Sequence, residues 1–239
     1  MPMKISSLSV FFPAFNEESN ITQTIEEAQS VLADLDIKPY EVIIVNDGSK
    51  DQTQEIAEGL AKKDPRIKVI NHLTNLGYGE ALKTGFYNSK YEWIVFTDSD
   101  GQFDFQEITR LIEKTDQADM VVGYRVNRQD HLMRIFNGKG WTFLANLLFG
   151  IGVRDVDCAF KLLKREIIEK IPKLESERGA MISPELLAKT KQAGFTIEQV
   201  PVSHHPRRSG KATGANLKVI VSSFVDMFKM WLKLRWSGF

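Results

Sequence analysis

The chain has 239 residues, of which 43% are hydrophobic and 26% are charged, so it has the composition of an ordinary globular protein with a substantial core. Its 31 Lys and Arg residues equal its 31 Asp and Glu residues in number, and a formal net charge of zero argues against nucleic-acid binding through bulk electrostatic attraction. The single cysteine, Cys158, excludes an internal disulfide and a cysteine-rich zinc site and favours a reducing, cytoplasmic setting.

The distribution of apolar residues predicts neither a signal peptide nor a membrane-spanning helix. Lys4 is followed by no uninterrupted apolar region before Pro13. A helix that crosses a bilayer needs about 18 or more apolar, uncharged residues in a row, and the sequence holds no such stretch. We therefore expect a cytoplasmic chain.

Short apolar runs alternate with segments of helical periodicity over the first half of the chain. The run Glu41 to Val45 is nearly continuous, which is typical of a strand buried on both faces of a parallel sheet. Repeated alternation of strand and helix predicts right-handed crossovers and a doubly wound α/β sheet. The expected strands are 8–12, 41–45, 67–70, the run from Trp93, and 120–123, and the helices between and after them are expected to end near residues 32, 64, 88 and 115.

The pattern changes after Gly123. Residues 125–139 are basic and polar, and we expect them to form a loop over the open edge of the sheet. Further along we expect a helix over 141–149, a helix from Ser183-Pro184 to about residue 193, and a last strand over 195–202.

Polar turns follow three of the predicted strands. Asp98 and Asp100 come directly after the run from Trp93, and Gln102 follows them. Ligands bind at the carboxyl ends of parallel strands, and carboxylate and amide oxygens suit a hard cation such as Mg²⁺ or Mn²⁺. The other turns are Pro13–Glu17 and Asn46–Ser49, and three acidic turns at one edge would repel one another unless a cation or hydrogen-bond donors lay among them. An Asp-rich turn without a ligand is the alternative interpretation.

Two familiar nucleotide-binding motifs do not account for these turns. The segment 77–82 has two glycines of the dinucleotide fingerprint but Leu82 in place of the third, and it follows the third strand rather than the first. The P-loop pattern Gly-x-x-x-x-Gly-Lys-Ser/Thr does not occur in the sequence.

Seven segments follow one another in an order that carries more information than any of them alone: Phe12–Glu18, Val45–Thr53, Asn75–Gly79, Asp98–Gln102, Gly123–Arg125, Val153–Leu162 and His205–Lys211. Together they resemble the family-2 glycosyltransferases of the GT-A fold, specifically the polyprenyl-phosphate branch of dolichyl-phosphate mannose or glucose synthase-like enzymes. The resemblance covers roughly residues 8–212. Asn46 stands where the family usually has an Asp, which leaves Asp47 as the only acid to contact the base, and Phe15 replaces a common Tyr.

The resemblance implies a GT-A, Rossmann-like α/β fold whose mostly parallel sheet is flanked by helices. It also implies that Asp98, Asp100 and Gln102 hold Mg²⁺ or Mn²⁺ and the diphosphate, and that the metal stabilises charge on the leaving nucleoside diphosphate. The residues that would hold the donor, a UDP- or GDP-sugar, are Pro13, Phe15, Glu17, Val45, Asp47, Asp98, Ser99 and Gln102.

An anionic acceptor would require positive charge beside this site. The resemblance implies that Arg125, Arg134 and Arg207 bind the phosphate of a polyprenyl phosphate, since guanidinium groups pair with phosphate bidentately. A surface salt bridge is the alternative role for each arginine taken alone.

The attacking phosphate oxygen is already anionic near neutral pH, so the reaction can proceed without a general base. If the enzyme uses one, Asp157 is the best candidate and Asp155 the next. Alternatively, both carboxylates orient Arg154, Lys161 or the acceptor arginines. The catalytic residues that we expect are Asp100, Asp157 and Arg125.

We expect one glycosyltransferase domain over 1–212 and a separate amphipathic helix over 213–239. The polar residues of this helix fall within an arc of roughly 80° on a helical projection. Its broad apolar face must pack on the domain or on a second subunit of a homo-oligomer, or lie in a membrane interface, and a lipid-linked acceptor favours the membrane. The polar residues are Lys218, Ser222, Asp226, Lys229 and Lys233; the apolar face has Val219, Phe224, Phe228, Trp231, Leu232 and Leu234, with Trp236 and Arg235 near its end.

We therefore expect a metal-dependent, inverting glycosyltransferase that moves a sugar from a nucleotide sugar to a polyprenyl phosphate, peripheral on the cytoplasmic face of the membrane. One alternative is a glycosyltransferase with a soluble or carbohydrate acceptor. Another is a sugar-phosphate nucleotidyltransferase, which shares the layered sheet and the acidic metal site. That class normally carries a Gly-rich, basic signature near its first strand, where this chain has the acidic turn Pro13–Glu17.

Overall fold

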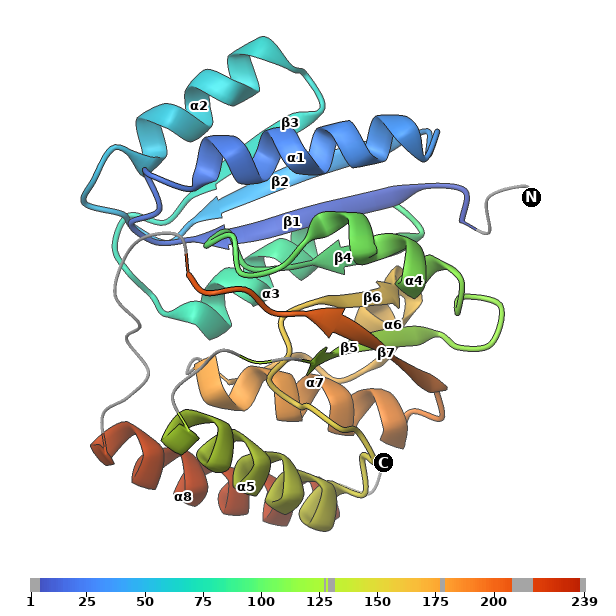
Figure 1. The fold of residues 1–239 in the computed structure, drawn as a ribbon. Coiled ribbons are helices and arrows are strands. Elements are labelled where there is room, and N and C mark those ends of the chain that lie inside the picture. Colours follow the sequence, from blue (N-terminus) through green and yellow to red (C-terminus); the bar gives the residue numbers. More distant parts are fainter. Residues whose placement is uncertain (1–4, 127, 129–131, 177–178, 208–216, 237–239) are drawn as a thin grey trace.

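A seven-stranded sheet in the order β3-β2-β1-β4-β6-β5-β7 forms the middle layer of the protein (Figure 1). The computed structural model describes residues 5–126, 128, 132–176, 179–207 and 217–236. The strands are β1 (Leu8–Ala14), β2 (Tyr40–Asn46), β3 (Ile67–Asn71), β4 (Trp93–Phe96), β5 (Met120–Val126), β6 (Lys161–Lys164) and β7 (Ile197–Ser203). The helices are α1 (Ile21–Asp34), α2 (Thr53–Lys63), α3 (Tyr78–Asn88), the 3₁₀ turn η1 (Phe105–Glu107), α4 (Ile108–Ile112), α5 (Leu132–Phe149), α6 (Arg165–Lys170), α7 (Gly179–Gln192) and α8 (Leu217–Trp236).

The sheet is mostly parallel, which confirms the predicted fold class. β1 pairs in parallel with β2 and β4, β2 with β3, and β5 with β7. β6 runs antiparallel to both of its neighbours, β4 and β5. This strand was not predicted, because it has only four residues and begins and ends with a lysine.

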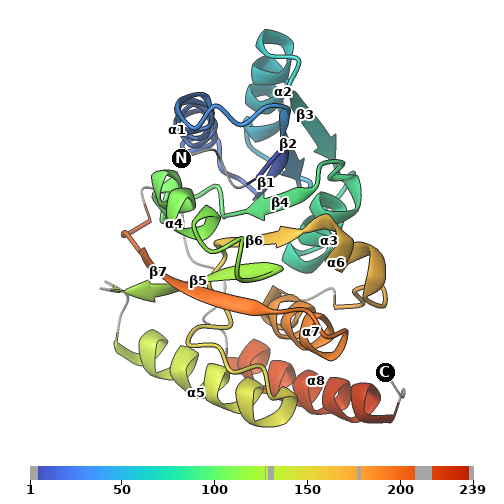
Figure 2. The ribbon, with the colours of Figure 1, turned by 90° about the vertical axis from the view of Figure 1, so that its right-hand side faces the viewer.

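Helices cover both faces of the sheet, with α1 and α4 on one face and α3, α6 and α7 on the other (Figure 2). Every residue of β1 and β2 is consequently buried, as their continuous apolar runs predicted. In the core, the ring of Phe11 in β1 stacks on Phe96 in β4 at a centroid distance of 5.3 Å and meets Phe86 of α3 edge-on at 5.0 Å. This packing holds β1 beside β4, so the turns that follow the two strands lie together.

Two predicted segments differ from the structure. The expected loop over 125–139 is wrong, because Arg125 belongs to β5 and α5 begins at Leu132. The start of α5 lacks a regular apolar pattern, so only the later part of the helix, over 141–149, was predicted. The next helix does not begin at Ser183-Pro184 either, since Pro184 lies inside α7. Buried Ile182 and Leu186 on either side of the proline hold the helix to the core despite the missing N–H.

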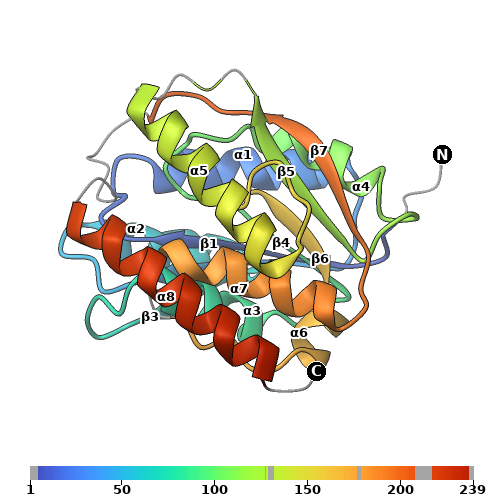
Figure 3. The same cartoon turned by 90° about the horizontal axis from the view of Figure 1, so that it is seen from below.

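The C-terminal helix α8 lies alongside α5 and against α7 (Figure 3). It buries Ser223, Met227 and Leu234, and the ring of Phe224 meets Trp141 of α5 edge-on at 5.4 Å. The side chains of residues 218, 219, 222 and 236, which belong to the predicted amphipathic pattern, lie outside the described part, as does the predicted boundary at 212. Among the described residues, no helix combines the length and apolar character needed to cross a membrane.

The packing of α3 on β1 leads to a prediction about stability. A Cβ added at Gly85 would lie 2.3 Å from the ring of Phe11, which is enclosed by other core side chains. We expect Gly85→Ala to lower the free energy of unfolding by about 1–3 kcal/mol, as overpacked cores do. A Cβ added at Gly59 in α2 would meet no heavy atom within 4 Å, so Gly59→Ala should be neutral or raise stability by up to about 1 kcal/mol. Chemical denaturation measures both, and equal effects would contradict the tight α3–β1 contact.

Candidate active site

The turns after β1, β2 and β4 interlock at one edge of the sheet. The hydroxyl of Ser99, after β4, donates to the carbonyl of Pro13 in β1 at 2.8 Å. The backbone N–H of Glu17 donates to the hydroxyl of Thr53, which lies beyond β2, at 2.8 Å. These hydrogen bonds hold the three turns together, as expected for turns that follow adjacent parallel strands.

Asn46 and its neighbours shape the turn after β2. The Asn46 amide donates to Oδ1 of Asn71 in β3 at 2.9 Å and accepts the N–H of Ser49 at 3.2 Å. Gly48 has a φ of 66°, and a Cβ there would lie 2.3 Å from the backbone of Thr74. An asparagine in place of the usual aspartate therefore satisfies the turn with two hydrogen bonds and no added charge.

Asp47 is 3% exposed and organises the connection between β3 and α3. Its carboxylate accepts the backbone N–H groups of Leu76 and Gly77, each at 2.9 Å. The ring of His72 completes the set, with Nδ1 2.7 Å from Asp47 Oδ1 and Nε2 2.9 Å from the hydroxyl of Thr84. Sequence reasoning missed His72, because no local pattern links it to a residue 25 positions away. The contact of Asp47 with a nucleobase stays a prediction.

Asp98 and Asp100 lie at the centre of the site. The hydroxyl of Tyr78 donates to Asp98 Oδ1 at 2.7 Å, and Arg207 Nη2 lies 2.9 Å from Asp100 Oδ2. Burial, and then the charge of Asp100, raise the pKa of Asp98 to about 6. Burial also raises the pKa of Asp100, while the charges of Arg207 and Arg134 oppose that rise. Burial raises the pKa of Tyr78 well above 10, so its phenol is a hydrogen-bond donor at neutral pH.

These residues fit a divalent cation. Two neighbouring carboxylates, one buried and one partly buried, both with raised pKa values, gain from a nearby positive charge. The amide nitrogen of Gln102 donates to the carbonyl of His205 at 3.1 Å, which leaves the amide oxygen as the atom that Gln102 could offer to a cation. Within the described part of the chain, no three acidic, histidine or cysteine residues form a ready metal cage. Carboxylate and amide oxygens are the ligand types that Mg²⁺ or Mn²⁺ would take, with water and substrate phosphates completing the coordination.

The three predicted acceptor arginines occupy different environments. Arg207 is half-buried and also lies 3.4 Å from Glu17 Oε1. Arg134 is exposed on α5, near enough for its charge to act on Asp100. Arg125 is largely buried and forms a bidentate pair with Asp155, at 2.7 and 2.8 Å. Residues 208–211 of the last sequence segment lie outside the described residues.

Asp155 and Asp157 lie beside Arg125 with opposite pKa behaviour. Burial opposes ionisation of Asp155, but the hydrogen bonds from Arg125 outweigh it and hold the pKa of Asp155 below its usual range. Burial raises the pKa of Asp157 to about 6. The indole N–H of Trp141 is close enough to oppose that rise, although among the described residues it meets no partner with hydrogen-bond geometry. The Asp155 pair is the contact that the orienting interpretation expected.

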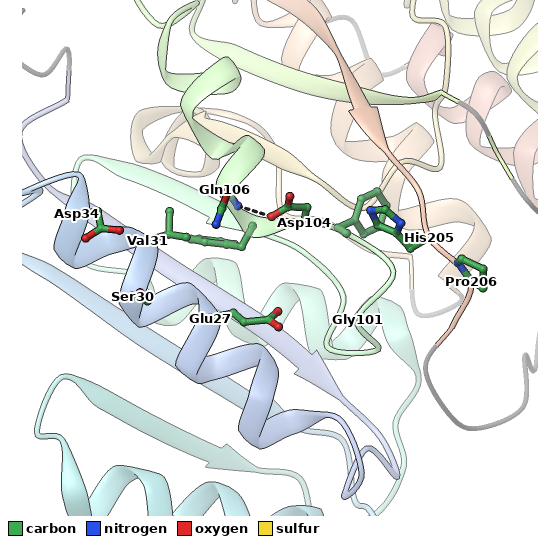
Figure 4. A pocket seen from close by; sticks show the side chains of 11 residues that line it. Glu27, Ser30, Val31, Asp34, Gly101, Asp104, Gln106, His205 and Pro206 are labelled. Carbon is green, nitrogen blue, oxygen red and sulfur yellow. Dashed lines mark hydrogen bonds between the residues drawn. The ribbon is translucent and has the colours of Figure 1, made fainter.

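The remaining predicted donor residues differ in accessibility. Phe15 is 37% exposed, so its ring is available to a base, whereas Val45 is fully buried inside β2. Glu17 is buried and accepts from the Asn20 amide at 2.6 Å. A cavity of about 570 Å³ lies beside the turn after β4 (Figure 4), lined by Glu27, Ser30, Val31, Asp34, Gly101, Phe103, Asp104, Phe105, Gln106, His205 and Pro206. It flanks the carboxylate pair and includes none of the three predicted metal ligands.

The two carboxylates beside Arg125 should respond oppositely to pH. Because the pKa of Asp157 is raised, the wild type loses stability as pH rises through about 6. The free energy of unfolding of Asp157→Asn, relative to that of the wild type, should therefore rise by about 2–3 kcal/mol from pH 4 to pH 7.5. The lowered pKa of Asp155 means that its ion pair is present above its unfolded pKa and is lost in acid, so Asp155→Asn should be destabilised at pH 7.5. Urea unfolding across this pH range measures both, and changes of the same sign would contradict the assignment.

Comparisons with known proteins identify the family of the chain. The family model of glycosyl transferase family 2 matches residues 9–172. A dolichyl-phosphate beta-glucosyltransferase, ALG5A of Trichomonas vaginalis, is 30% identical over 93% of this chain and 72% of its own. An undecaprenyl-phosphate 4-deoxy-4-formamido-L-arabinose transferase of Pectobacterium atrosepticum is 33% identical over 90% of this chain, which spans only 65% of that relative.

Solved structures share the fold at low sequence identity. Glucosyl-3-phosphoglycerate synthase from Mycobacterium tuberculosis, in complex with Mn²⁺ and uridine-diphosphate-glucose, superposes with a TM-score of 0.71 at 20% identity, covering 95% of this chain and 79% of its own. The curated relatives carry names from the polyprenyl-phosphate branch that the sequence resembles. The chain is therefore a glycosyltransferase of GT-A fold that belongs to glycosyl transferase family 2.

Proposed function

We propose that this glycosyltransferase moves one sugar from a nucleotide sugar to the phosphate of a polyprenyl phosphate, with inversion at the sugar carbon. The observation that carries the proposal is the meeting of arginine guanidinium groups with the carboxylate pair, above all Arg207 with Asp100. A site with acidic ligands on one side and arginines on the other suits a metal-bound diphosphate facing an anionic acceptor. The names of the relatives in the polyprenyl-phosphate branch support the acceptor class.

The donor half of the site consists of the three interlocked turns. Phe15, Glu17 and Asp47 lie where a nucleoside would meet the ends of β1 and β2, with Pro13, Val45 and Ser99 forming the supporting backbone. Asp98, Asp100 and Gln102 would hold Mg²⁺ or Mn²⁺. A bound metal would stabilise the negative charge that develops on the leaving diphosphate.

The acceptor half is positively charged. Arg134 and Arg207 are exposed enough to contact phosphate oxygens, whereas Asp155 orients Arg125 toward the same edge. An anionic phosphate oxygen attacks the sugar carbon, and the bond between that carbon and the diphosphate breaks on the opposite side. The nucleophile carries its own charge, so Asp157 can act as an orienting group rather than as a base.

We propose that α5 and α8 together bring the enzyme to the membrane. Both helices lie side by side on the outside of the protein (Figures 1 and 3). Large apolar side chains are exposed at helical spacing on each: Phe136, Phe143 and Leu147 on α5, and Phe224, Val225, Phe228 and Leu232 on α8. Exposed Lys229 and Arg235 add positive charge that suits anionic headgroups. The predicted peripheral position on the cytoplasmic face thus rests on two helices rather than on the tail alone.

A soluble, phosphorylated acceptor is the second candidate. A structural neighbour that shares the fold at 20% identity, the Mycobacterium tuberculosis glucosyl-3-phosphoglycerate synthase, was crystallised with the soluble compound phosphoglyceric acid. The decisive experiment incubates the full chain with UDP- or GDP-sugars, Mn²⁺ or Mg²⁺, and either a polyprenyl phosphate or a soluble phosphomonoester. A glycosylated lipid phosphate, identified by mass spectrometry, supports the proposal. Transfer only to the soluble acceptor would replace it.

The metal assignment predicts the behaviour of Asp100→Asn. Loss of one charged ligand should lower kcat by about 100-fold or more and weaken the metal-dependent binding of UDP or GDP. Asp104→Asn is the matched control, because Asp104 lies on the same turn and caps η1 by accepting the N–H of Gln106, which an asparagine can also do. Calorimetry with and without Mn²⁺ measures binding. Unchanged metal-dependent binding in Asp100→Asn would remove this residue from the metal site.

The apolar helices predict how the protein behaves with vesicles. Phe143→Ser and Phe228→Ser should each weaken partitioning onto vesicles with anionic lipid by about tenfold, since each removes a large apolar side chain from the contact. Nucleotide binding should be retained, because neither residue lies among the donor turns. Leu73→Ser changes a fully exposed leucine outside the two helices and should leave vesicle binding unchanged. If both α5 and α8 variants instead dissociate an oligomer and vesicle binding is absent, the surface is a subunit interface.

A further inference from the structure

Two adjacent residues at the start of α3 connect the carboxylate after β2 with the carboxylate after β4. Gly77 donates its backbone N–H to Asp47 Oδ2 at 2.9 Å. Tyr78, the next residue, donates its hydroxyl to Asp98 Oδ1 at 2.7 Å. The chain from Asp47 through Gly77 and Tyr78 to Asp98 therefore spans the nucleoside side and the metal side of the proposed site.

The start of α3 is held in place by Asp47. Gly77 has a φ of 98°, a conformation that glycine adopts without strain and that places its N–H toward Asp47. Leu76 contributes a second N–H to Asp47 Oδ1 at 2.9 Å. His72 bonds Asp47 with one ring nitrogen and Thr84, within α3, with the other. A substitution of Asp47 would consequently alter the position of Tyr78.

Tyr78 affects Asp98 in a way that suits a cation ligand. A carboxylate crowded by Asp100 has no fixed orientation of its own unless a donor holds one oxygen. The phenol is neutral, so it orients the carboxylate without supplying a positive charge that would compete with a metal. With Oδ1 held by Tyr78, Oδ2 is the oxygen that Asp98 would offer to a cation. In metal sites, partners of this kind orient the ligands and tune affinity.

We propose that Tyr78 is a positioning residue for the metal ligand Asp98, and that Asp47 sets the affinity of the metal site through Gly77 and Tyr78. The inference rests on the proposed function, because it takes Asp98 as a metal ligand and Asp47 as a residue of the donor site. Tyr78 had no predicted role of its own, and it physically connects the donor side and the metal side of the site.

The first test is the affinity of the full chain for Mn²⁺ alone, measured by electron paramagnetic resonance of the free ion. Tyr78→Phe keeps the ring and removes the donor, and it should weaken Mn²⁺ binding by about tenfold. The matched control is Tyr91→Phe, which removes a phenol just before β4, at the opposite end of that strand, and should leave Mn²⁺ binding unchanged. A Tyr78→Phe protein that binds Mn²⁺ like the wild type would overturn the role of Tyr78.

The second test is a double-mutant cycle with Asp47→Asn. This change removes a negative charge from the region, which by itself weakens Mn²⁺ binding through space, and it also loosens the start of α3. The through-space effect persists in a Tyr78→Phe background, whereas the effect transmitted through Tyr78 does not. We expect the Asp47→Asn change to cost several-fold less in Mn²⁺ affinity when Tyr78 is already Phe. Strictly additive effects would overturn the connection through Gly77 and Tyr78.

The outcomes also separate this inference from the proposed function. A wild-type protein that binds neither Mn²⁺ nor a nucleoside diphosphate would overturn the metal and donor assignments, and the connection with them. A wild-type protein that binds both, with Tyr78→Phe unaffected, would leave the proposed function intact and overturn the inference alone. Circular dichroism melting of each variant establishes that the compared proteins are folded.

Discussion

The constraint on which the rest of the site depends is the closeness of two carboxylates at the end of β4, buried Asp100 and partly buried Asp98. Burial raises the pKa of both, because neither carboxylate can be fully hydrated and each adds to the negative potential around the other. The surrounding residues supply donors and positive charge: the phenol of Tyr78, the guanidinium of Arg207, and the backbone N–H of Gln102, which donates to Asp100 Oδ1 at 3.0 Å. The same constraint makes the site receptive to a divalent cation.

The arginines around this pair divide into two kinds, although the family resemblance implied one role for all three. Arg125 is nearly buried and its charge is matched by Asp155, so its direction is fixed before any substrate arrives. Arg207 and Arg134 act on Asp100 from more accessible positions. For the proposed acceptor phosphate, accessible arginines would supply attraction and a fixed guanidinium would supply orientation, because attraction needs charge whereas orientation needs a rigid donor.

Much of this arrangement could be predicted from the sequence because its main determinants are local. Continuous apolar runs identified β1 and β2, and the acidic residues directly after them and after β4 identified the edge at which they meet. The missed features depend on distant partners. Tyr78 contacts a residue 20 positions away and His72 one 25 positions away, and neither distance leaves a trace in a single sequence. β6 was missed because four residues flanked by lysines carry no strand pattern, and its Lys161 is fully buried, where its ammonium donates to the carbonyls of Val156 and Cys158.

The C-terminal helix shows why two interpretations of one apolar pattern need not exclude each other. A helix that packs on a domain along one stripe still presents another stripe outward. In α8 the inner stripe contains Ser223, Met227 and Leu234, and the outer stripe contains Phe224, Phe228 and Leu232, each set at helical spacing. The inner stripe is mainly apolar, as packing on the domain requires, but the outer stripe is apolar as well, which a helix fully satisfied by its own domain would not show. Because α5 exposes aromatic and aliphatic side chains beside α8, the two helices form an apolar surface that is unfavourable in water. A lipid bilayer would cover this surface, and the proposed polyprenyl acceptor would require a bilayer as well.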